Sequence, residues 1–130
     1  MLIFGLGYTA SRIAAALRAQ GWAVEATGSA SDLAFEDEAA VHAALGQASH
    51  VLSSVPPADE SDPVLDRYAD RLTHGWIGYL SSTGVYGGAQ GAWVDETAPT
   101  GTGRRSARSQ ADARWLALGA LVASGIVSYF

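Results

Sequence analysis

Short apolar runs alternate with amphipathic segments along most of the chain. The apolar runs predict strands at residues 2–4, 22–27, 33–35, 50–55, 75–82 and 126–130. The segments between them predict helices at residues 10–20, 38–45, 63–72 and 105–118. Strand–helix alternation of this kind predicts a doubly wound α/β fold, in which helices cover both faces of a parallel sheet.

Residues that commonly start or stop helices support these boundaries. Gly21 and Gly46 follow the first and second predicted helices, and glycine often stands just past a helix end. Asp62 is expected to cap the third helix, with Pro63 at its first position. No proline- or serine-rich linker divides the chain, so residues 1–130 are expected to form one domain or part of one.

The turn between the first strand and the first helix carries the most informative motif. It fits the pattern G-x-G-x-x-A, directly after a strand and at the start of an amphipathic helix. The first glycine permits a tight turn, the second lets the backbone approach a pyrophosphate, and the alanine allows close helix–strand packing. Free N–H groups at the helix start would face the anion. Glycines also occur in tight strand–helix turns without a ligand, but this context predicts a dinucleotide site formed by Gly5, Leu6, Gly7, Tyr8, Thr9 and Ala10.

Composition narrows the classes of function. The chain has 130 residues, a formal net charge of -5, no cysteine and no lysine. The acidic balance argues against a nucleic-acid partner, because no basic surface neutralises phosphate groups. Disulfides and zinc–thiolate sites are excluded, no metal site is expected, and no apolar run reaches the ~20 residues of a membrane span. We therefore expect a soluble cytoplasmic protein that does not act on membranes.

The choice between NAD and NADP stays open. An NAD site usually places an acid near the end of the second strand, but the candidate Glu25 lies short of the Gly28–Ser29 stop. No arginine follows that strand to hold the additional phosphate of NADP. Thr27, Gly28 and Ser29 are expected to contact the ribose of either cofactor.

Three further segments, together with the glycine loop, resemble a known family. Ser53-Ser54-Val55-Pro56-Pro57 follows a predicted strand, and residues 76–87 contain the run Ser-Ser-Thr-Gly-Val-Tyr-Gly. Residues 93–96 are similar to an acidic segment that follows this run in the family. The chain thus resembles the extended short-chain dehydrogenases of the NAD-dependent epimerase/dehydratase group. The resemblance covers nearly the whole chain but only about the first half of a family member, without the substrate-binding half.

The resemblance implies a Rossmann fold with strand order 3-2-1-4-5-6 and a cofactor across the strand ends. Ser54, Val55 and Pro56 would flank the nucleotide where the fourth strand ends. Ser82 matches the family's catalytic serine, which hydrogen-bonds the reacting oxygen. The alternative for Ser82 is a serine that only satisfies backbone groups at a strand end.

The family's catalytic Tyr-x-x-x-Lys pair is absent. Residues four apart share a helix face, so that the lysine of the pair lowers the pKa of the tyrosine and binds the nicotinamide ribose. Aligning Asp112 with the acid that usually follows the pair places Arg104 at the tyrosine position and Arg108 at the lysine position. Arg108 can supply a cation and hydrogen bonds to a ribose. Arg104 cannot act as an acid or base near neutral pH, because a guanidinium stays protonated.

Other charged groups have two interpretations each. Arg104, Arg105 and Arg108 form either a solvated helix start or an anion clamp for a cofactor phosphate or an acidic substrate. The acids of residues 59–62 flank a proline turn, and we expect them in a solvated loop rather than in a metal site.

The last apolar run, at residues 126–130, resembles a central strand with no helix after it. Such an edge is normally covered. Three explanations stay open: a fragment of a longer protein, a homodimer that covers the exposed sheet, or a disrupted reading frame. The family resemblance implies that the last predicted helix would supply the contact surface of a homodimer, here through Trp115, Leu116, Leu118 and Leu121.

Three functions therefore compete. The first is an NAD(P)-dependent oxidoreductase or epimerase-like enzyme on an unidentified small-molecule substrate, with Ser82 and Arg108 in its active site. The second is a catalytically inactive dinucleotide-binding sensor or regulatory module, which the missing tyrosine and lysine favour. The third is a structural remnant that binds no cofactor. Binding of NAD or NADP would separate the third from the other two.

Overall fold

The apolar runs form a parallel sheet, in a computed structural model that describes residues 1–29, 31, 33–86, 92–95, 97–100 and 106–125. The sheet has five strands in the order β2-β1-β3-β4-β5, and every pairing is parallel. The strands are β1 (Leu2–Phe4), β2 (Glu25–Ala26), β3 (His50–Ser53), β4 (Trp76–Ser82) and β5 (Leu121–Gly125). The helices are α1 (Tyr8–Ala19), α2 (Glu38–Gln47), α3 (Pro63–Tyr68) and α4 (Ser106–Ala117), with short 3-10 turns η1 (Ala69–Arg71) and η2 (Thr83–Val85).

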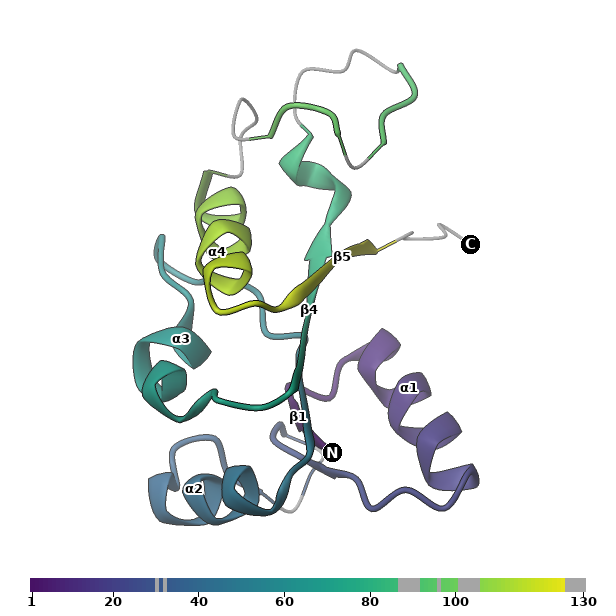
Figure 1. Ribbon diagram of the computed structural model, residues 1–130, viewed down its shortest axis with the longest axis vertical. Coiled ribbons are helices and arrows are strands. Elements are labelled where there is room, and N and C mark those ends of the chain that lie inside the picture. The colour runs from purple at the N-terminus through teal and green to yellow at the C-terminus, as the bar shows by residue number, and fades with distance from the viewer. Residues whose placement is uncertain (30, 32, 87–91, 96, 101–105, 126–130) are drawn as a thin grey trace.

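Helices cover both faces of this sheet, which confirms the doubly wound α/β prediction. Helix α1 lies on one face, and α2, α3 and α4 lie on the other (Figure 1). On the α1 face Ala10 and Ala14 are fully buried, because small side chains let a helix approach the strands closely. On the opposite face Tyr79 stacks on Trp115 with ring centroids 5.2 Å apart, inside the larger apolar core.

The register of the central strands sets where the connecting loops meet. Phe4 of β1 pairs with Ser53 of β3, which in turn pairs with Tyr79 of β4. The Ser54 N–H then donates to the Phe4 carbonyl at 2.8 Å and continues the pairing one residue further. The segments after β1, β3 and β4 therefore leave the sheet at one edge, at the carboxyl ends of its strands.

Two strand predictions need correction. The second strand is only Glu25–Ala26 instead of 22–27, and residues 33–35 form no strand beyond a single bridge between Thr27 and Leu33. The bridge continues from the end of β2, but it does not extend into a strand at residues 33–35. The observed order is thus the expected 3-2-1-4-5-6 order without its outer third strand.

The last strand also differs from the prediction. Strand β5 occupies Leu121–Gly125, where it pairs with Gly78–Ser82 of β4. The predicted strand at residues 126–130 lies outside the described residues. Pairing with β4, rather than local β-propensity, decided where the strand begins.

The helix boundaries are mostly close to their predictions, with two exceptions. Helix α2 continues through Gly46 to Gln47, so the predicted stop at Gly46 is wrong. The predicted helix at 63–72 divides into α3 and η1.

Asp62 caps α3 as expected but does not belong to a solvated loop. Its Oδ1 accepts the N–H groups of Val64 and Leu65, each at 3.0 Å. Its Oδ2 accepts the indole N–H of Trp115 at 2.8 Å, and the residue is only 1% exposed. This buried carboxylate therefore joins α3 to α4. The acidic composition of residues 59–62 had indicated a solvated loop instead.

The four residues expected to form a dimer surface do not share a face. Trp115 is fully buried in the chain's own core, and Leu121 lies in β5 rather than on the helix. Leu116 and Leu118 are exposed. The prediction of a helical dimer face through these four residues is therefore wrong.

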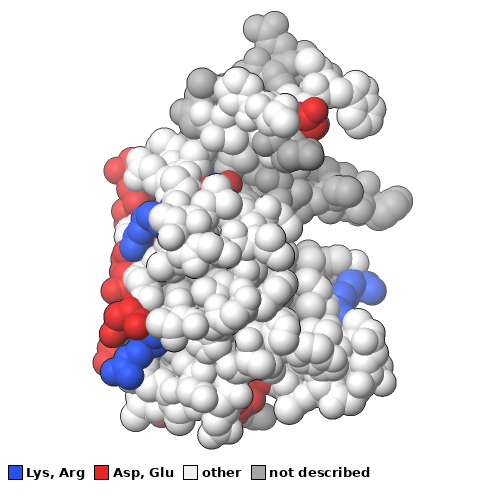
Figure 2. Space-filling view, in the orientation of Figure 1, with Lys and Arg blue, Asp and Glu red and all other residues white. Residues whose placement is uncertain are grey.

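Charge is spread unevenly over the surface. Acidic side chains gather along the edge formed by α2, α3 and α4 (Figure 2), where Glu38 pairs with Arg67 and Asp66 with Arg114. In the part of the chain that the structure describes, no helix combines the length and the apolar character needed to cross a membrane.

Candidate functional site

The glycine loop is held in place from two neighbouring strand ends. Gly5 has φ +80°, and a Cβ there would lie 2.9 Å from Cγ2 of Val55, so only glycine fits without strain. The Gly5 N–H donates to Oγ1 of Thr27 at 3.1 Å, and the Ser54 hydroxyl donates to the Gly5 carbonyl at 2.7 Å. Thr27 after β2 and Ser54 after β3 thus position the turn after β1.

The turn presents the bare amino end of α1. Gly7 is the N-cap residue, and no side chain caps the helix there. The first turn carries no acid, and a Cβ placed on Gly7 would meet nothing within 4 Å. Unpaired N–H groups, the positive end of the helix dipole and open space together suit an anion such as a diphosphate.

A hollow of about 340 Å³ lies over this helix end. Its walls come from four parts of the chain: the glycine loop, the segment after β3, the end of β4 and α4. The lining residues are Gly7, Tyr8, Thr9, Ala10, Ser54, Pro56, Leu80, Ser81, Ser82 and Arg108. Eight of the predicted site residues therefore share one hollow at the carboxyl ends of the strands.

Arg108 reaches the hollow from α4 and is held by β4. Its Nη1 donates to the Tyr79 hydroxyl at 3.2 Å and to the Leu80 carbonyl at 3.4 Å. Tyr79 is fully buried, and burial raises the pKa of its phenol to about 12. A neutral phenol and a carbonyl thus orient a cation without neutralising it.

Two adjacent serines at the end of β4 have different partners. Ser82 lines the hollow and accepts the Gly84 N–H at 3.2 Å, so it also satisfies the backbone of η2. Ser81 lines the hollow as well, and its hydroxyl lies 2.6 and 2.8 Å from the two carboxylate oxygens of Asp112. Burial raises the pKa of Asp112, while the hydrogen bond from Ser81 and the charge of Arg108 oppose that rise.

Other predicted site residues lie beneath or beside the hollow. Thr27 is 1% exposed, and Val55 packs against Gly5, so both support the loop from below. Leu6 lines a separate depression towards β2.

At the end of β2, Gly28 has φ +143°, and a Cβ there would lie 3.2 Å from the backbone nitrogen of Leu6. Ser29, next to it, is exposed. Arg104 and Arg105 lie outside the described residues, so the tyrosine-position assignment and the three-arginine cluster stay predictions.

Sequence reasoning missed the residues that surround Arg108. Asp112 was used only to align the last helix, although it stands four residues after Arg108 and therefore on the same helix face. Ser81 had no local signal of a role, because only its neighbour Ser82 matches the family's catalytic serine. Tyr79 had no local signal, since its role depends on a helix 29 residues further along the chain.

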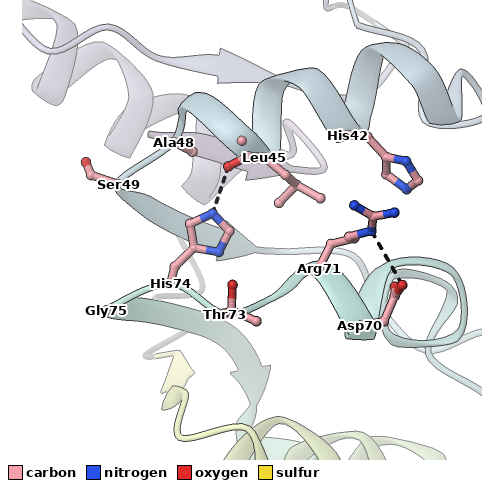
Figure 3. A pocket seen from close by; sticks show the side chains of 10 residues that line it. His42, Leu45, Ala48, Ser49, Asp70, Arg71, Thr73, His74 and Gly75 are labelled. Carbon is pink, nitrogen blue, oxygen red and sulfur yellow. Dashed lines mark hydrogen bonds and ion pairs between the residues drawn. The ribbon is translucent and has the colours of Figure 1, made fainter.

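A second and larger hollow, of about 620 Å³, lies at the opposite ends of the strands (Figure 3). It is lined by the end of α2, by η1 and by the segment before β4. The His74 Nε2 lies 2.9 Å from the Leu45 carbonyl, which can only accept, so Nε2 carries the proton. The helix end that borders this hollow is a carboxyl end, whose carbonyl groups disfavour an anion.

Comparisons with known proteins place the fold but not the activity. No protein-family model matches the chain, and no curated protein matches it either. A solved structure of a functionally unknown conserved protein from Silicibacter pomeroyi is 34% identical, with a TM-score of 0.73 over 93% of this chain and 50% of that chain.

A second solved structure contains bound NAD. It is a short-chain dehydrogenase/reductase superfamily protein from Agrobacterium tumefaciens with bound NAD, 19% identical, with a TM-score of 0.57 over 89% of this chain and 43% of that chain. The chain thus spans about half the length or less of both structures. The parallel sheet, its helices and this likeness together establish an α/β, Rossmann-like fold.

Proposed function

We propose that this chain binds NAD or NADP across the carboxyl ends of β1, β3 and β4. The observation that carries the proposal is the shared hollow, which joins the uncapped amino end of α1 to Ser82 and Arg108. The diphosphate would lie on the N–H groups that follow Gly7. Arg108 would face a ribose or a phosphate, in the position that the family resemblance gives to a lysine.

We further propose that the chain is the nucleotide-binding part of an oxidoreductase or epimerase-like enzyme of the short-chain dehydrogenase type. Ser82 lines the hollow beside Arg108, where the reacting end of a bound nicotinamide would lie. The substrate is a small molecule whose class this part of the chain does not specify. NAD binding in the Agrobacterium tumefaciens protein, whose fold is similar, supports the cofactor class.

A dinucleotide-binding module without hydride chemistry is the second candidate. The described residues that line the hollow include no lysine or histidine, and the one tyrosine among them, Tyr8, is 77% exposed at its mouth. No lining residue thus matches the paired tyrosine and lysine of the family. This observation favours a sensor or regulatory role unless another group supplies the proton.

Titration with NADH and NADPH tests the cofactor proposal. We expect saturable binding with one site per chain, seen as a change in nicotinamide fluorescence and as quenching of tryptophan. Absence of binding of both dinucleotides at up to about 1 mM, which corresponds to roughly -4 kcal/mol, would contradict it.

A matched pair of glycine variants locates the site. In Gly7→Asp the new carboxylate points into open space at the helix end that should hold the diphosphate, so binding should weaken by at least about 100-fold. Gly46→Asp also enters open space, but at the border of the opposite hollow, and should leave binding unchanged. Equal effects of the two substitutions would place the dinucleotide elsewhere.

A further inference from the structure

Reduction of a carbonyl group needs a proton as well as a hydride, and the family's usual proton donor is absent from this chain. The titratable groups near the hollow are therefore the candidates for a replacement proton donor. Tyr79 is fully buried and accepts a hydrogen bond from Arg108. Burial raises the pKa of its phenol to about 12. Arg108 stays charged. Neither is suited to exchange a proton near neutral pH.

One carboxyl group lies a single hydrogen bond away from the hollow. Asp112 is half-buried on α4, and both of its oxygens lie within 2.8 Å of the Ser81 hydroxyl. Ser81 itself lines the hollow, next to Ser82 and opposite the glycine loop. Among the hydrogen bonds of the described residues, the Ser81 hydroxyl is therefore the link between the hollow and Asp112.

The groups around Asp112 shift its pKa in opposite directions. Arg108, one turn earlier on α4, is the cation that faces it, and β4 contributes Ser81 and the neutral Tyr79. Strand β5 and turn η2, which also pack against α4, carry no titratable side chain. Burial raises the pKa of Asp112, and the hydrogen bond from Ser81 and the charge of Arg108 oppose that rise.

We infer that Ser81 and Asp112 are the proton-transferring pair of this site, in place of the missing tyrosine, for a ligand that carries a carbonyl or hydroxyl group. This inference rests on the proposed dinucleotide function. In it Ser81 is the catalytic residue that touches the ligand, and Asp112 acts through Ser81 as the store of the proton.

Reduction of a carbonyl group at this site would move one hydride and two protons. When bound, a reduced nicotinamide would supply the hydride for the new C–H bond, and the electron pair of the C=O π bond would move to the oxygen. That oxygen takes the proton of the Ser81 hydroxyl, and the Ser81 Oγ takes the proton of the Asp112 carboxyl. Asp112 is left as a carboxylate and regains a proton from water. In the direction of alcohol oxidation the same protons move in reverse.

A second serine–aspartate pair provides an internal control. Ser61 donates to Asp66 at the surface, where hydrogen bonds from Ser61 and Arg114 lower the pKa of Asp66. The two pairs share their chemistry, but Ser61 and Asp66 do not line the hollow. A response to the cofactor should therefore appear at Asp112 and not at Asp66.

The test follows the carboxyl carbons of aspartate by NMR in the ¹³C-labelled chain between about pH 4 and 8. Asp112→Asn and Asp66→Asn identify the two signals. The pH titration is made on three samples: the chain without ligand, the chain saturated with the oxidised dinucleotide, and the chain saturated with the reduced dinucleotide. The dinucleotide is whichever of NAD and NADP binds more tightly. Ser81→Ala and Ser81→Thr test the hydroxyl.

We expect the titration midpoint of Asp112 to be lower with the oxidised dinucleotide than with the reduced one, by roughly half a pH unit or more, because the oxidised ring is positively charged. By linkage, the ratio of the affinity for the oxidised form to that for the reduced form should rise about threefold through this midpoint in the native chain and stay flat in Asp112→Asn. Ser81→Ala should raise the midpoint, and Ser81→Thr should restore it.

Two failures can be told apart. If neither dinucleotide binds, the proposed function fails and the inference fails with it. If a dinucleotide binds but the Asp112 midpoint is the same with both forms, and Asp112→Asn keeps the native pH dependence, the inference alone is overturned. Ser81 and Asp112 then only join α4 to β4.

Discussion

The two hollows at opposite ends of the parallel strands differ in size and in chemistry. The one at the amino ends is larger, about 620 Å³ against 340 Å³, and it contains His42, His74 and Arg71. The one at the carboxyl ends contains a glycine loop, Arg108 and two serines. Size and the number of polar side chains would favour the amino-end hollow as the binding site.

The direction of the helices favours the other hollow. All strands are parallel, so helices begin near the carboxyl ends of the strands and finish near the amino ends. The carboxyl-end hollow therefore meets the N–H groups of α1, and the amino-end hollow meets the carbonyl groups of α2. A ligand site for an anion follows the helix dipole and the free N–H groups rather than the volume.

The largest expected effect separates two glycines, one at each hollow. Gly5→Ala forces a positive φ on alanine and presses its Cβ against Val55, so we expect a loss of roughly 2–4 kcal/mol in the free energy of unfolding. Gly75→Ala borders the amino-end hollow, where a Cβ meets nothing within 4 Å, and should change stability little. Urea unfolding measures both. Equal stability of the two variants would show that the Gly5 turn relaxes freely.

The next comparison uses two arginines. Arg108→Gln removes the cation of the carboxyl-end hollow and should weaken NADH or NADPH binding about tenfold, equivalent to roughly 1.4 kcal/mol. Arg71→Gln removes an exposed arginine of the amino-end hollow, paired with Asp70, and should leave the affinity unchanged. Fluorescence titration of both variants with NADH and NADPH measures these affinities. A loss of affinity only in Arg71→Gln would move the site to the larger hollow.

A histidine at the larger hollow should matter for stability alone. His74→Gln loses the geometry of the hydrogen bond to the Leu45 carbonyl, which should cost about 1 kcal/mol of unfolding free energy. Dinucleotide affinity should stay at its native value, because the residue lies at the far ends of the strands. Thermal unfolding and titration of the same sample test the two statements, and weakened binding would contradict the second.

The smallest effect is the pH dependence of stability at Asp112. The folded-state pKa of Asp112 is raised, so its contribution is complete below the ordinary value of 3.8 and is lost as the pH rises through the raised value. The native chain should therefore lose slightly more stability than Asp112→Asn between about pH 4 and 7, by less than about 1 kcal/mol because solvent screens a half-exposed group.

Asp66 behaves in the opposite sense. Its folded-state pKa is lowered, so its contribution is present above the ordinary value and is lost as the pH falls below it. This loss is common to the native chain and to Asp112→Asn, so it cancels in the difference between them. A difference that grows instead towards neutral pH in favour of the native chain would contradict the sign for Asp112.

The glycine loop shows what local sequence can predict. A strand, a turn with Gly5 and Gly7, and a helix whose small residues face the sheet are consecutive in the chain, and each has a short-range physical cause. The prediction of an open helix end at that place needed no knowledge of distant residues. The cap at Asp62 and the alternation of strands and helices are of the same kind.

The partners of Asp62, Ser81 and Arg108 show what local sequence cannot predict. Ser81 meets Asp112 across 31 residues, and Asp62 meets Trp115 across 53 residues. Neither aspartate carries a local signal of its burial or of its distant partner. Only the packing of α4 on β4 and α3 brings these side chains together and withdraws them from water.

The sequence alone therefore determined the fold class and the turn on which a dinucleotide would lie, because periodicity, helix caps and glycine conformations are properties of neighbouring residues. The tertiary structure decided the rest: that β2 is only Glu25–Ala26, that β5 begins at Leu121, and that Arg108 and Asp112 flank the end of β4. These features depend on strand register and on helix packing, which join residues far apart in the chain and leave no pattern in either segment.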